Sequence, residues 1–308
     1  MSATALRAPF PYFGGKRRAA ELIWSAFGNV DHYVEPFAGS AAVLLARPHV
    51  GRCETINDLD GMVANFWRAV RSQPDAVAEA CDWPVIEADL HARHLWLIGQ
   101  RESLTARLIA DPEWCDAKAA GWWAWGSGAW VGSGWCDSGK PPQQLPQLSR
   151  PGQGVHILSL RGNGLPGLLG DLRARLRNVR VACGDWSRVV TPAVMHHPAP
   201  GAVGVFVDPP YAEGAQQYAA GGTGTDLSAR VRAWCASNES DPRVRIVLSG
   251  YDGEHNDLHA RGWRVVEWKA LGGYGNAAGN DNAARERLWL SPHCLRDESL
   301  PLFGGGAR

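Results

Sequence analysis

Apolar and polar positions along most of this chain form short blocks that are typical of strands joined by helices. The clearest block is Val203 to Val207, whose apolar run Val-Gly-Val-Phe-Val predicts a short buried strand. Further strands are predicted at residues 32–34, 54–56, 179–182, 245–249, 264–268 and 286–290. Apolar residues at spacings of three and four predict a helix over 17–27, and a second helix opens at Ala41. This strand–helix–strand order predicts an α/β fold of the nucleotide-binding type.

The pattern changes between residues 61 and 178. Helices are predicted at 62–70, 76–81 and 87–109, followed by a Trp- and Gly-rich stretch at 122–139, a Pro/Gln/Gly loop at 140–154 and a basic helix at 168–177. We therefore expect one α/β domain, formed by residues 1–60 and 179–308 and split by a helical and loop-rich insert at 61–178.

Composition narrows the class of protein. The 308 residues are 45% hydrophobic, as in an ordinary globular protein, and no apolar run approaches the ~20 residues that cross a membrane. Prolines, glycines and Lys16 interrupt the N-terminal segment, which lacks the apolar core of a secretion signal. A cytoplasmic protein is expected. The seven cysteines are scattered without a Cys-x-x-Cys pair, which predicts reduced thiols and neither disulfides nor a metal site.

The net charge of zero gives no support to a nucleic-acid partner. Charge is nevertheless uneven, because residues 143–180 contain six arginines and a single acid, Asp171. Six tryptophans fall between Trp114 and Trp135. Stacking on unpaired bases is one interpretation of these rings, and packing within a small helical subdomain is the other, which is favoured for most of them.

The tetrad Asp208-Pro209-Pro210-Tyr211 follows the apolar run at 203–207, where open α/β sheets bind their ligands. The two prolines prevent further strand pairing and restrict the backbone. A stiff turn thus brings together a carboxylate, a peptide carbonyl and an aromatic ring. This set suits a planar base with an exocyclic amine, although a strand-ending turn without a chemical role is the alternative.

A second strand is followed by the turn 35–40, in which Gly39 allows a ligand to approach the backbone. Asp58 ends the next strand nineteen residues after Gly39, a spacing suited to an acid that accepts ribose hydroxyls. Asp60 competes for this role, or caps the helix that starts near Gly61. A pyrophosphate-binding second Gly-x-x-Gly is missing, which favours a nucleoside-type cofactor. Asp185, after the strand at 179–182, is a further candidate for the cofactor, and a turn acid is its alternative.

In this order, the segments 11–16 (Pro-Tyr-Phe-Gly-Gly-Lys), 35–40 (Glu-Pro-Phe-Ala-Gly-Ser), 57–58 (Asn-Asp) and 208–211 resemble the D12 class of adenine-specific DNA methyltransferases, the Dam-like group. Segments 272–275 and 285–289 resemble phage and prophage members. The resemblance implies a Rossmann-like methyltransferase fold, S-adenosylmethionine as cofactor, and adenine N6 of a flipped-out base in double-stranded DNA as acceptor. It makes 61–178 the target-recognition insert.

Carried over by position, the resemblance assigns Asp208 and the Pro209 carbonyl to the target amine and Tyr211 to the target ring, with Pro210 completing the catalytic tetrad. It places Asp58 at the ribose and Asp185 near the cofactor adenine. The cofactor-binding residues expected are Tyr12, Lys16, Glu35, Pro36, Phe37, Gly39, Ser40, Asp58, Asp185, Trp186 and Asp208. The DNA contacts expected are Arg150, Arg161, Asn163 and Trp130.

Two other functions fit the same residues: a cytosine-N4 DNA methyltransferase, and a catalytically silent DNA-binding relative. A restriction nuclease is a candidate partner. Residues 299–303 (Ser-Leu-Pro-Leu-Phe) look like the short peptides that dock on the replication sliding clamp, although the usual leading Gln is missing. A packed or disordered terminus is the alternative.

Overall fold

The computed structural model describes residues 6–12, 16–132, 134–137, 144–148, 164–196, 201–210, 224–268 and 285–296. The chain forms two compact units. The helical unit consists of residues 1–15, 39–41 and 58–185, and the sheet unit consists of residues 16–38, 42–57 and 186–308. Each is described in turn.

The sheet unit is organised by parallel strands. Strands β1 (His32–Glu35), β4 (Val203–Val207) and β5 (Val244–Tyr251) are parallel, and β2 (Cys53–Asp58) pairs with β1 in the same direction. Beyond β5, the antiparallel strand β7 (Glu286–Leu290) separates it from β6 (Arg264–Glu267). The order β2-β1-β4-β5-β7-β6 therefore has one reversed strand.

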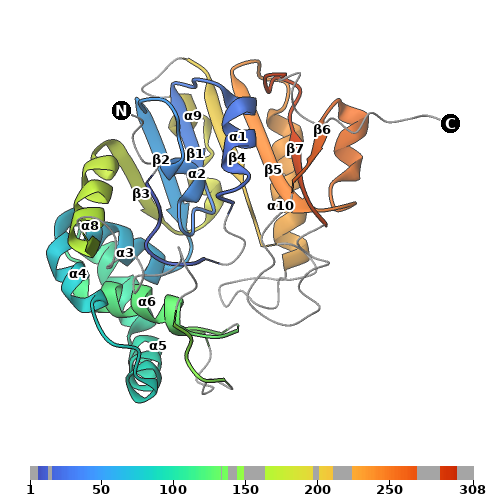
Figure 1. Ribbon diagram of the computed structural model, residues 1–308. Helices are drawn as coiled ribbons and strands as arrows, with labels where there is room; N and C mark the ends of the chain where they lie inside the picture. The colour runs from blue at the N-terminus through green and yellow to red at the C-terminus, as the bar shows by residue number, and fades with distance from the viewer. Residues whose placement is uncertain are drawn as a thin grey trace. The chain divides into compact units, whose positions relative to one another are not determined.

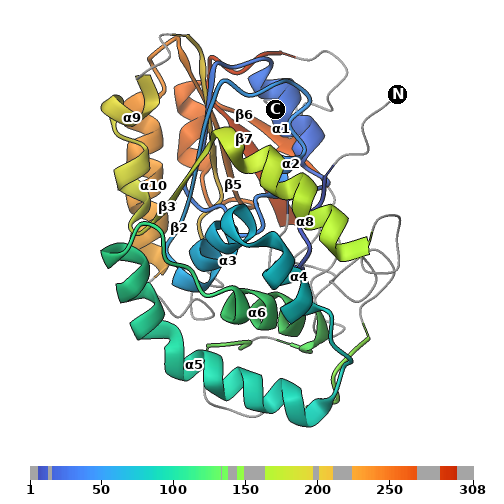
Figure 2. The ribbon, with the colours of Figure 1, turned by 90° about the vertical axis from the view of Figure 1, so that its left-hand side faces the viewer.

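Helices cover both faces of this sheet. Helices α1 (Ala20–Phe27) and α2 (Ala42–Leu45) lie on one face, and α9 (Pro192–His196) and α10 (Gly224–Asn238) lie on the other (Figures 1 and 2). All five residues of β4 are buried, as a strand covered on both faces requires. Gly204 in β4 is needed for this packing, because a Cβ there would lie 3.0 Å from the Phe27 ring of α1.

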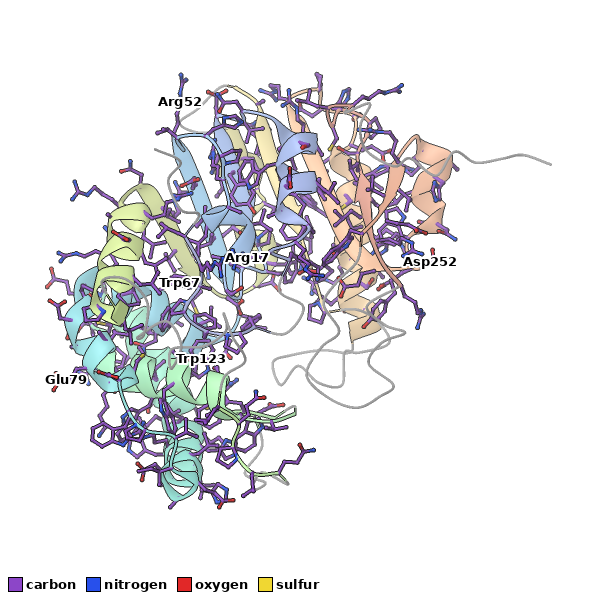
Figure 3. The ribbon with its side chains drawn as sticks, viewed as in Figure 1. Arg17, Arg52, Trp67, Glu79, Trp123 and Asp252 are labelled. Atoms are coloured by element: carbon purple, nitrogen blue, oxygen red, sulfur yellow. The ribbon has the colours of Figure 1, made fainter. Side chains whose placement is uncertain are left out.

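The helical unit contains α3 (Gly61–Ser72), α4 (Pro74–Cys81), α5 (Glu87–Ala110), α6 (Ala117–Ala129) and α8 (Gly164–Arg175), followed by the 3-10 turn η1 (Leu176–Asn178) and strand β3 (Val179–Cys183). Asp60 and Asp116 cap α3 and α6 by accepting backbone N–H groups of their first turns. Aromatic rings fill the interior, where Phe10 contacts Phe66, Trp67 and Trp123 at centroid distances of 4.9, 6.0 and 4.7 Å (Figure 3).

Most predicted elements are confirmed, and β4 and β7 match their predicted ranges to the residue. The first part of the predicted Trp- and Gly-rich stretch, residues 122–129, belongs to helix α6. Gly121, in the same helix, is a packing residue. A Cβ on Gly121 would lie 2.4 Å from the Ala80 Cβ and 2.9 Å from the Val77 carbonyl of α4, so only glycine lets the two helices approach this closely.

Two further outcomes concern the chain as a whole. None of the helices in the described ranges combines the length and hydrophobicity that crossing a membrane requires. The compact units divide the chain at other residues than the predicted domain and insert, since 1–15, 39–41, 58–60 and 179–185 group with the helical unit. The division into an α/β domain (1–60 and 179–308) and a target-recognition insert (61–178) stays a prediction.

Two glycine substitutions should change stability in opposite directions. Gly121→Ala forces a methyl group against α4 and should lower the free energy of unfolding by ~1–3 kcal/mol. Gly99→Ala, inside α5 with open space around it, should raise it by ~0.5–1 kcal/mol through helix propensity. Urea unfolding measures both, and an equal effect of the two substitutions would contradict the packing role of Gly121.

Candidate active site

The backbone of Gly39 is held from two sides in the helical unit. Its N–H donates to the Asp58 Oδ2 atom over 2.9 Å, and its carbonyl accepts from the indole N–H of Trp67 over 3.1 Å. The Asp58 Oδ1 atom accepts from the Asp60 N–H over 2.9 Å. Gly39, the glycine predicted to approach the cofactor, is therefore hydrogen-bonded to Asp58, the acid predicted to bind the ribose.

Tyr12 lies against Gly39, which explains why glycine is required there. Gly39 has a φ of +46°, and a Cβ on it would fall 2.4 Å from two atoms of the Tyr12 ring. Ala41, two residues on, also has a positive φ of 50° although it carries a side chain. Such conformations cost ~1–3 kcal/mol and cluster at ligand-binding loops. The structure thus unites Tyr12, Gly39 and Asp58, three residues predicted to bind the cofactor.

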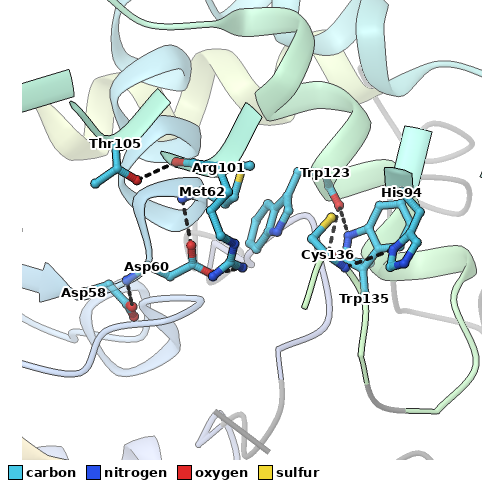
Figure 4. Close-up of polar contacts among 10 residues, drawn as sticks. Asp58, Asp60, Met62, His94, Arg101, Thr105, Trp123, Trp135 and Cys136 are labelled. Atoms are coloured by element: carbon cyan, nitrogen blue, oxygen red, sulfur yellow. Dashed lines mark hydrogen bonds and ion pairs between the residues drawn. The ribbon is translucent and has the colours of Figure 1, made fainter. Parts of the chain in front are cut away.

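Asp58 and Asp60 have different roles, which the sequence left open. Asp60 is the N-cap of α3, where its Oδ1 atom accepts from the Met62 N–H over 2.9 Å and its Oδ2 atom pairs with Arg101 over 3.1 Å (Figure 4). Asp58 is half-buried, and burial raises its pKa to about 6 against the opposing hydrogen bonds. Because Asp60 is committed to the helix, Asp58 is the acid suited to a ligand.

Asp185 follows β3 and lies near the end of β2. The Gly184 N–H donates to the Asp58 carbonyl over 3.0 Å, which fixes the turn that presents Asp185. The Asp185 side chain is exposed, whereas Ser40 in the glycine turn is buried. An exposed carboxylate beside the end of β2 agrees with the predicted position near the cofactor, and its role stays a prediction.

In the sheet unit, the buried ammonium of Lys16 lies between two carboxylates. Its Nζ atom is 3.1 Å from the Asp208 Oδ2 atom and 3.4 Å from the Glu286 Oε2 atom, and it lies 5.8 Å from the centre of the Trp268 ring. Lys16 is only 3% exposed, so this is a buried ion cluster rather than a surface pair. Glu286 and Trp268 had no role predicted from the sequence. The only feature of the sequence that pointed to Glu286 was its charge at the first position of an otherwise mostly apolar predicted strand.

Glu35, at the end of β1, is buried among protein groups. Its Oε2 atom accepts from the Tyr33 hydroxyl over 2.9 Å and from the Leu44 N–H, in the first turn of α2, over 3.3 Å. Burial raises the pKa of Glu35 to about 8, with a smaller contribution from the charge of Asp208. Glu35 is therefore mostly protonated at neutral pH. These hydrogen bonds hold the Glu35 carboxyl group inside the protein, and it presents no charge to solvent.

Phe37 and Trp186, both predicted to contact the cofactor, lie against each other in the sheet unit. Their rings stack with centroids 5.9 Å apart at 28°, and Trp234 contacts Trp186 edge-on at 6.2 Å. Trp234 was not found from the sequence. The Pro36 carbonyl accepts from the Asn57 side-chain amide over 3.0 Å, which ties the turn after β1 to β2.

Several predicted residues lie outside the described residues, namely Tyr211, Arg150, Arg161, Asn163 and the segments 272–275 and 299–303. Trp130 is described and is buried. Its ring stacks on His94 with a centroid distance of 4.5 Å and contacts Trp135 at 5.3 Å. This is the packing role that the sequence favoured for most of the tryptophans.

A cleft of about 620 Å³ lies elsewhere in the helical unit, between α3–α4 and α8. Arg71, Arg173, Arg177 and Asp75 line it, and none of the predicted catalytic or cofactor residues does. Among the described residues, no group of three or more His, Cys, Asp or Glu side chains is arranged to hold a metal ion.

Residues 12–90 match the family described as D12 class N6 adenine-specific DNA methyltransferase. The match contains Tyr12, Lys16, the turn 35–40 and Asp58, and it confirms the resemblance found in the sequence. With the helix-flanked, mostly parallel sheet, it supports the predicted Rossmann-like fold, S-adenosylmethionine as methyl donor and adenine N6 in DNA as acceptor. Neither cytosine N4 nor a silent relative gains support. No curated protein matches this chain.

The raised pKa of Glu35 predicts a loss of stability on the alkaline side. Because the folded protein holds this proton more tightly than the unfolded chain, the stability is complete below the unfolded pKa of about 4.5 and is lost towards pH 8. Glu35→Gln keeps the acceptor and has no proton to lose. The variant should therefore become progressively more stable than the wild type between pH 5 and 8.5, by up to about 5 kcal/mol.

Urea unfolding at a series of pH values measures this difference. Tyr33→Phe serves as a matched variant, because it removes a hydrogen bond that lowers the pKa of Glu35 and should steepen the alkaline loss. Parallel stability curves for wild type and Glu35→Gln would show that Glu35 is ionised in the fold.

Proposed function

We propose how this S-adenosylmethionine-dependent adenine-N6 DNA methyltransferase holds its substrates: Asp208 and the Pro209 carbonyl bind the target amine, and the turn 35–40 with Tyr12 and Asp58 binds the cofactor. One observation carries the proposal. Lys16, inside the segment that matches the family, forms an ion pair of 3.1 Å with Asp208, which lies far outside that segment. This ion pair supports the proposal because it joins Asp208 to a residue of the matched segment within the sheet unit.

The residues of the turn fit the proposed cofactor. Gly39 lacks the Cβ that would collide with Tyr12. Each oxygen of the Asp58 carboxylate accepts one backbone N–H group, from Gly39 and from Asp60, and can still accept a hydrogen bond from a ribose hydroxyl. Phe37, stacked on Trp186, offers an apolar ring. When bound, S-adenosylmethionine supplies a methyl group already activated by a sulfonium. We propose the same cofactor role for Pro36, Ser40 and Asp185, with Lys16 and Glu35 acting through the groups that they hold.

Activation of the target amine falls to Asp208 and Pro209. Adenine N6 is a weak nucleophile because its lone pair is delocalised into the ring. Hydrogen bonds from N6 to the Asp208 carboxylate and the Pro209 carbonyl localise that pair, and fixed acceptors do so without reorganisation during the reaction. Lys16 fixes the carboxylate, and Pro209 and Pro210 restrict the backbone around the carbonyl.

The target adenine must leave the DNA stack to reach this corner. We propose that Tyr211 stacks on the flipped base, which would restore ~1–3 kcal/mol of the stacking lost. The insert 61–178 is proposed to recognise the target sequence, with Arg150, Arg161 and Asn163 contacting DNA phosphates or base edges. For Trp130, a base contact would require its ring to leave His94, so its contribution is proposed to be indirect.

Three further proposals concern the origin and the protein partners of this methyltransferase, and they are based on the sequence. We retain the phage or prophage type, a cognate restriction nuclease, and clamp docking through 299–303 as proposals. Cleavage of unmethylated sites by a nuclease encoded beside this protein would establish the pairing. Capture of the sliding clamp that is unaffected by deletion of 299–308 would exclude the docking peptide.

Asp208→Ala should separate chemistry from cofactor binding. The variant lacks the acceptor for N6 but keeps the Asp58 and Gly39 contacts, so methyl transfer should fall by at least about a hundredfold. The dissociation constant for S-adenosylmethionine should change by less than about threefold. Transfer of labelled methyl to DNA and titration calorimetry measure the two effects. Near-normal turnover in this variant would refute the role of Asp208.

Asp58→Ala and Asp60→Ala form a matched pair for cofactor binding. Asp58→Ala removes a charged acceptor and releases the Gly39 N–H, so affinity for S-adenosylmethionine should fall about ten- to a hundredfold. Asp60→Ala removes the cap of α3 and should cost ~1 kcal/mol of stability while affinity is kept within about threefold. Calorimetry and urea unfolding test both, and unchanged affinity in Asp58→Ala would exclude the ribose role.

A further inference from the structure

Glu286 is a second carboxylate at the ammonium that holds the proposed catalytic acid. Its Oε2 atom lies 3.4 Å from the Lys16 Nζ atom, and the Asp208 Oδ2 atom lies 3.1 Å from the same nitrogen. The side chains of Lys16, Asp208 and Glu286 are 3%, 18% and 11% exposed. Water therefore screens these charges weakly, and each carboxylate changes how strongly the ammonium acts on the other.

The reversed direction of β7 explains how this residue reaches the catalytic corner. Strands β4 and β5 are parallel, with Val207 opposite Leu248, so both end at the same edge of the sheet as Asp208. In the antiparallel β7, the first residue lies at that edge, because Glu286 is paired with Tyr251 at the end of β5. A parallel strand in this place would put its last residue there instead.

Lys16 interacts with two carboxylates at once. Its ammonium lies 3.1 Å from the Asp208 carboxylate and 3.4 Å from the Glu286 carboxylate, so its attraction is divided between them. Burial keeps Glu35, whose pKa is about 8, mostly protonated at neutral pH. The Trp268 ring lies on Lys16 without adding charge. Because Glu286 also attracts the ammonium, Lys16 compensates the charge of Asp208 less than it would in an isolated pair.

We propose that Glu286 is a positioning residue for methyl transfer: it shares Lys16 with Asp208, so that Lys16 orients the catalytic carboxylate without cancelling its charge. This inference rests on the proposed function of Asp208. Bound S-adenosylmethionine would supply the methyl group: the N6 lone pair would form the new N–C bond, the methyl–sulfur bond would break with its electron pair remaining on sulfur, and N6 would release one proton to solvent water. Positive charge would grow on N6 beside Asp208 during this step, and the carboxylate of Asp208 would stabilise it.

Glu286→Gln tests the proposal because it keeps the shape of the side chain and removes the charge. At saturating cofactor and DNA, the single-turnover rate of methyl transfer should fall about tenfold, with dissociation constants for both substrates within about threefold of wild type. Glu267→Gln is the matched control, since Glu267 lies on the neighbouring strand β6 and pairs with Arg287 at 2.9 Å. It should change the rate less than about twofold.

A double-mutant cycle with Lys16→Met separates this role from a general effect on the fold. If Glu286 acts through Lys16, Glu286→Gln should have little further effect on the rate in the Lys16→Met background. Glu286→Asp retains the charge and should keep more activity than Glu286→Gln. Melting temperatures show whether each variant is folded, and rates are compared per folded molecule.

Three results would overturn the assignment: a normal rate for Glu286→Gln, the same rate loss with and without Lys16, or less activity in Glu286→Asp than in Glu286→Gln. The Asp208→Ala variant keeps this outcome distinct from failure of the proposed function. If Asp208→Ala is inactive while Glu286→Gln is fully active, only the role of Glu286 is wrong. If Asp208→Ala is active, the proposed function itself fails.

Discussion

Burying an ammonium group is unfavourable unless carboxylates surround it, and this constraint organises the edge of the sheet unit at which β4 ends. Lys16 meets it with Asp208 after β4 and Glu286 at the start of β7. Three segments that are distant in the sequence are therefore fixed to one nitrogen. The proposed acceptor for the target amine gains its orientation from this cluster, while the two prolines after it stiffen the backbone.

The turn that follows β1 is held by different means, because its important atoms belong to the backbone. Gly39 is fixed by Asp58, Trp67 and the ring of Tyr12, and these contacts maintain the positive φ values at Gly39 and Ala41. Such a turn is preorganised for a ligand that approaches the main chain closely. In the sheet unit, burial favours the protonated form of Glu35 at the end of β1.

The sequence predicted elements best where an apolar run is bounded by turn residues, as at 203–207 and 286–290. It assigned no helix to the residues of α6, where Gly121 allows close packing against α4, because such packing depends on the fold rather than on local pattern. The motifs predicted roles for Gly39, Asp58 and Asp208, which stay predictions, and only the structure shows that Asp60 is the cap of α3. Glu286 and Trp268 could not be assigned, since their position depends on the antiparallel insertion of β7 between β5 and β6.

The reversal of β7 also has a consequence for folding. Lys16 and Glu286 come from segments separated by most of the chain, and contacts of such high sequence separation close the largest loops and carry a large entropic cost. An intermediate in which β4 has docked but β7 has not would lack one of the two counter-charges of Lys16. Completion of the charge environment of Lys16 is thereby coupled to completion of the sheet.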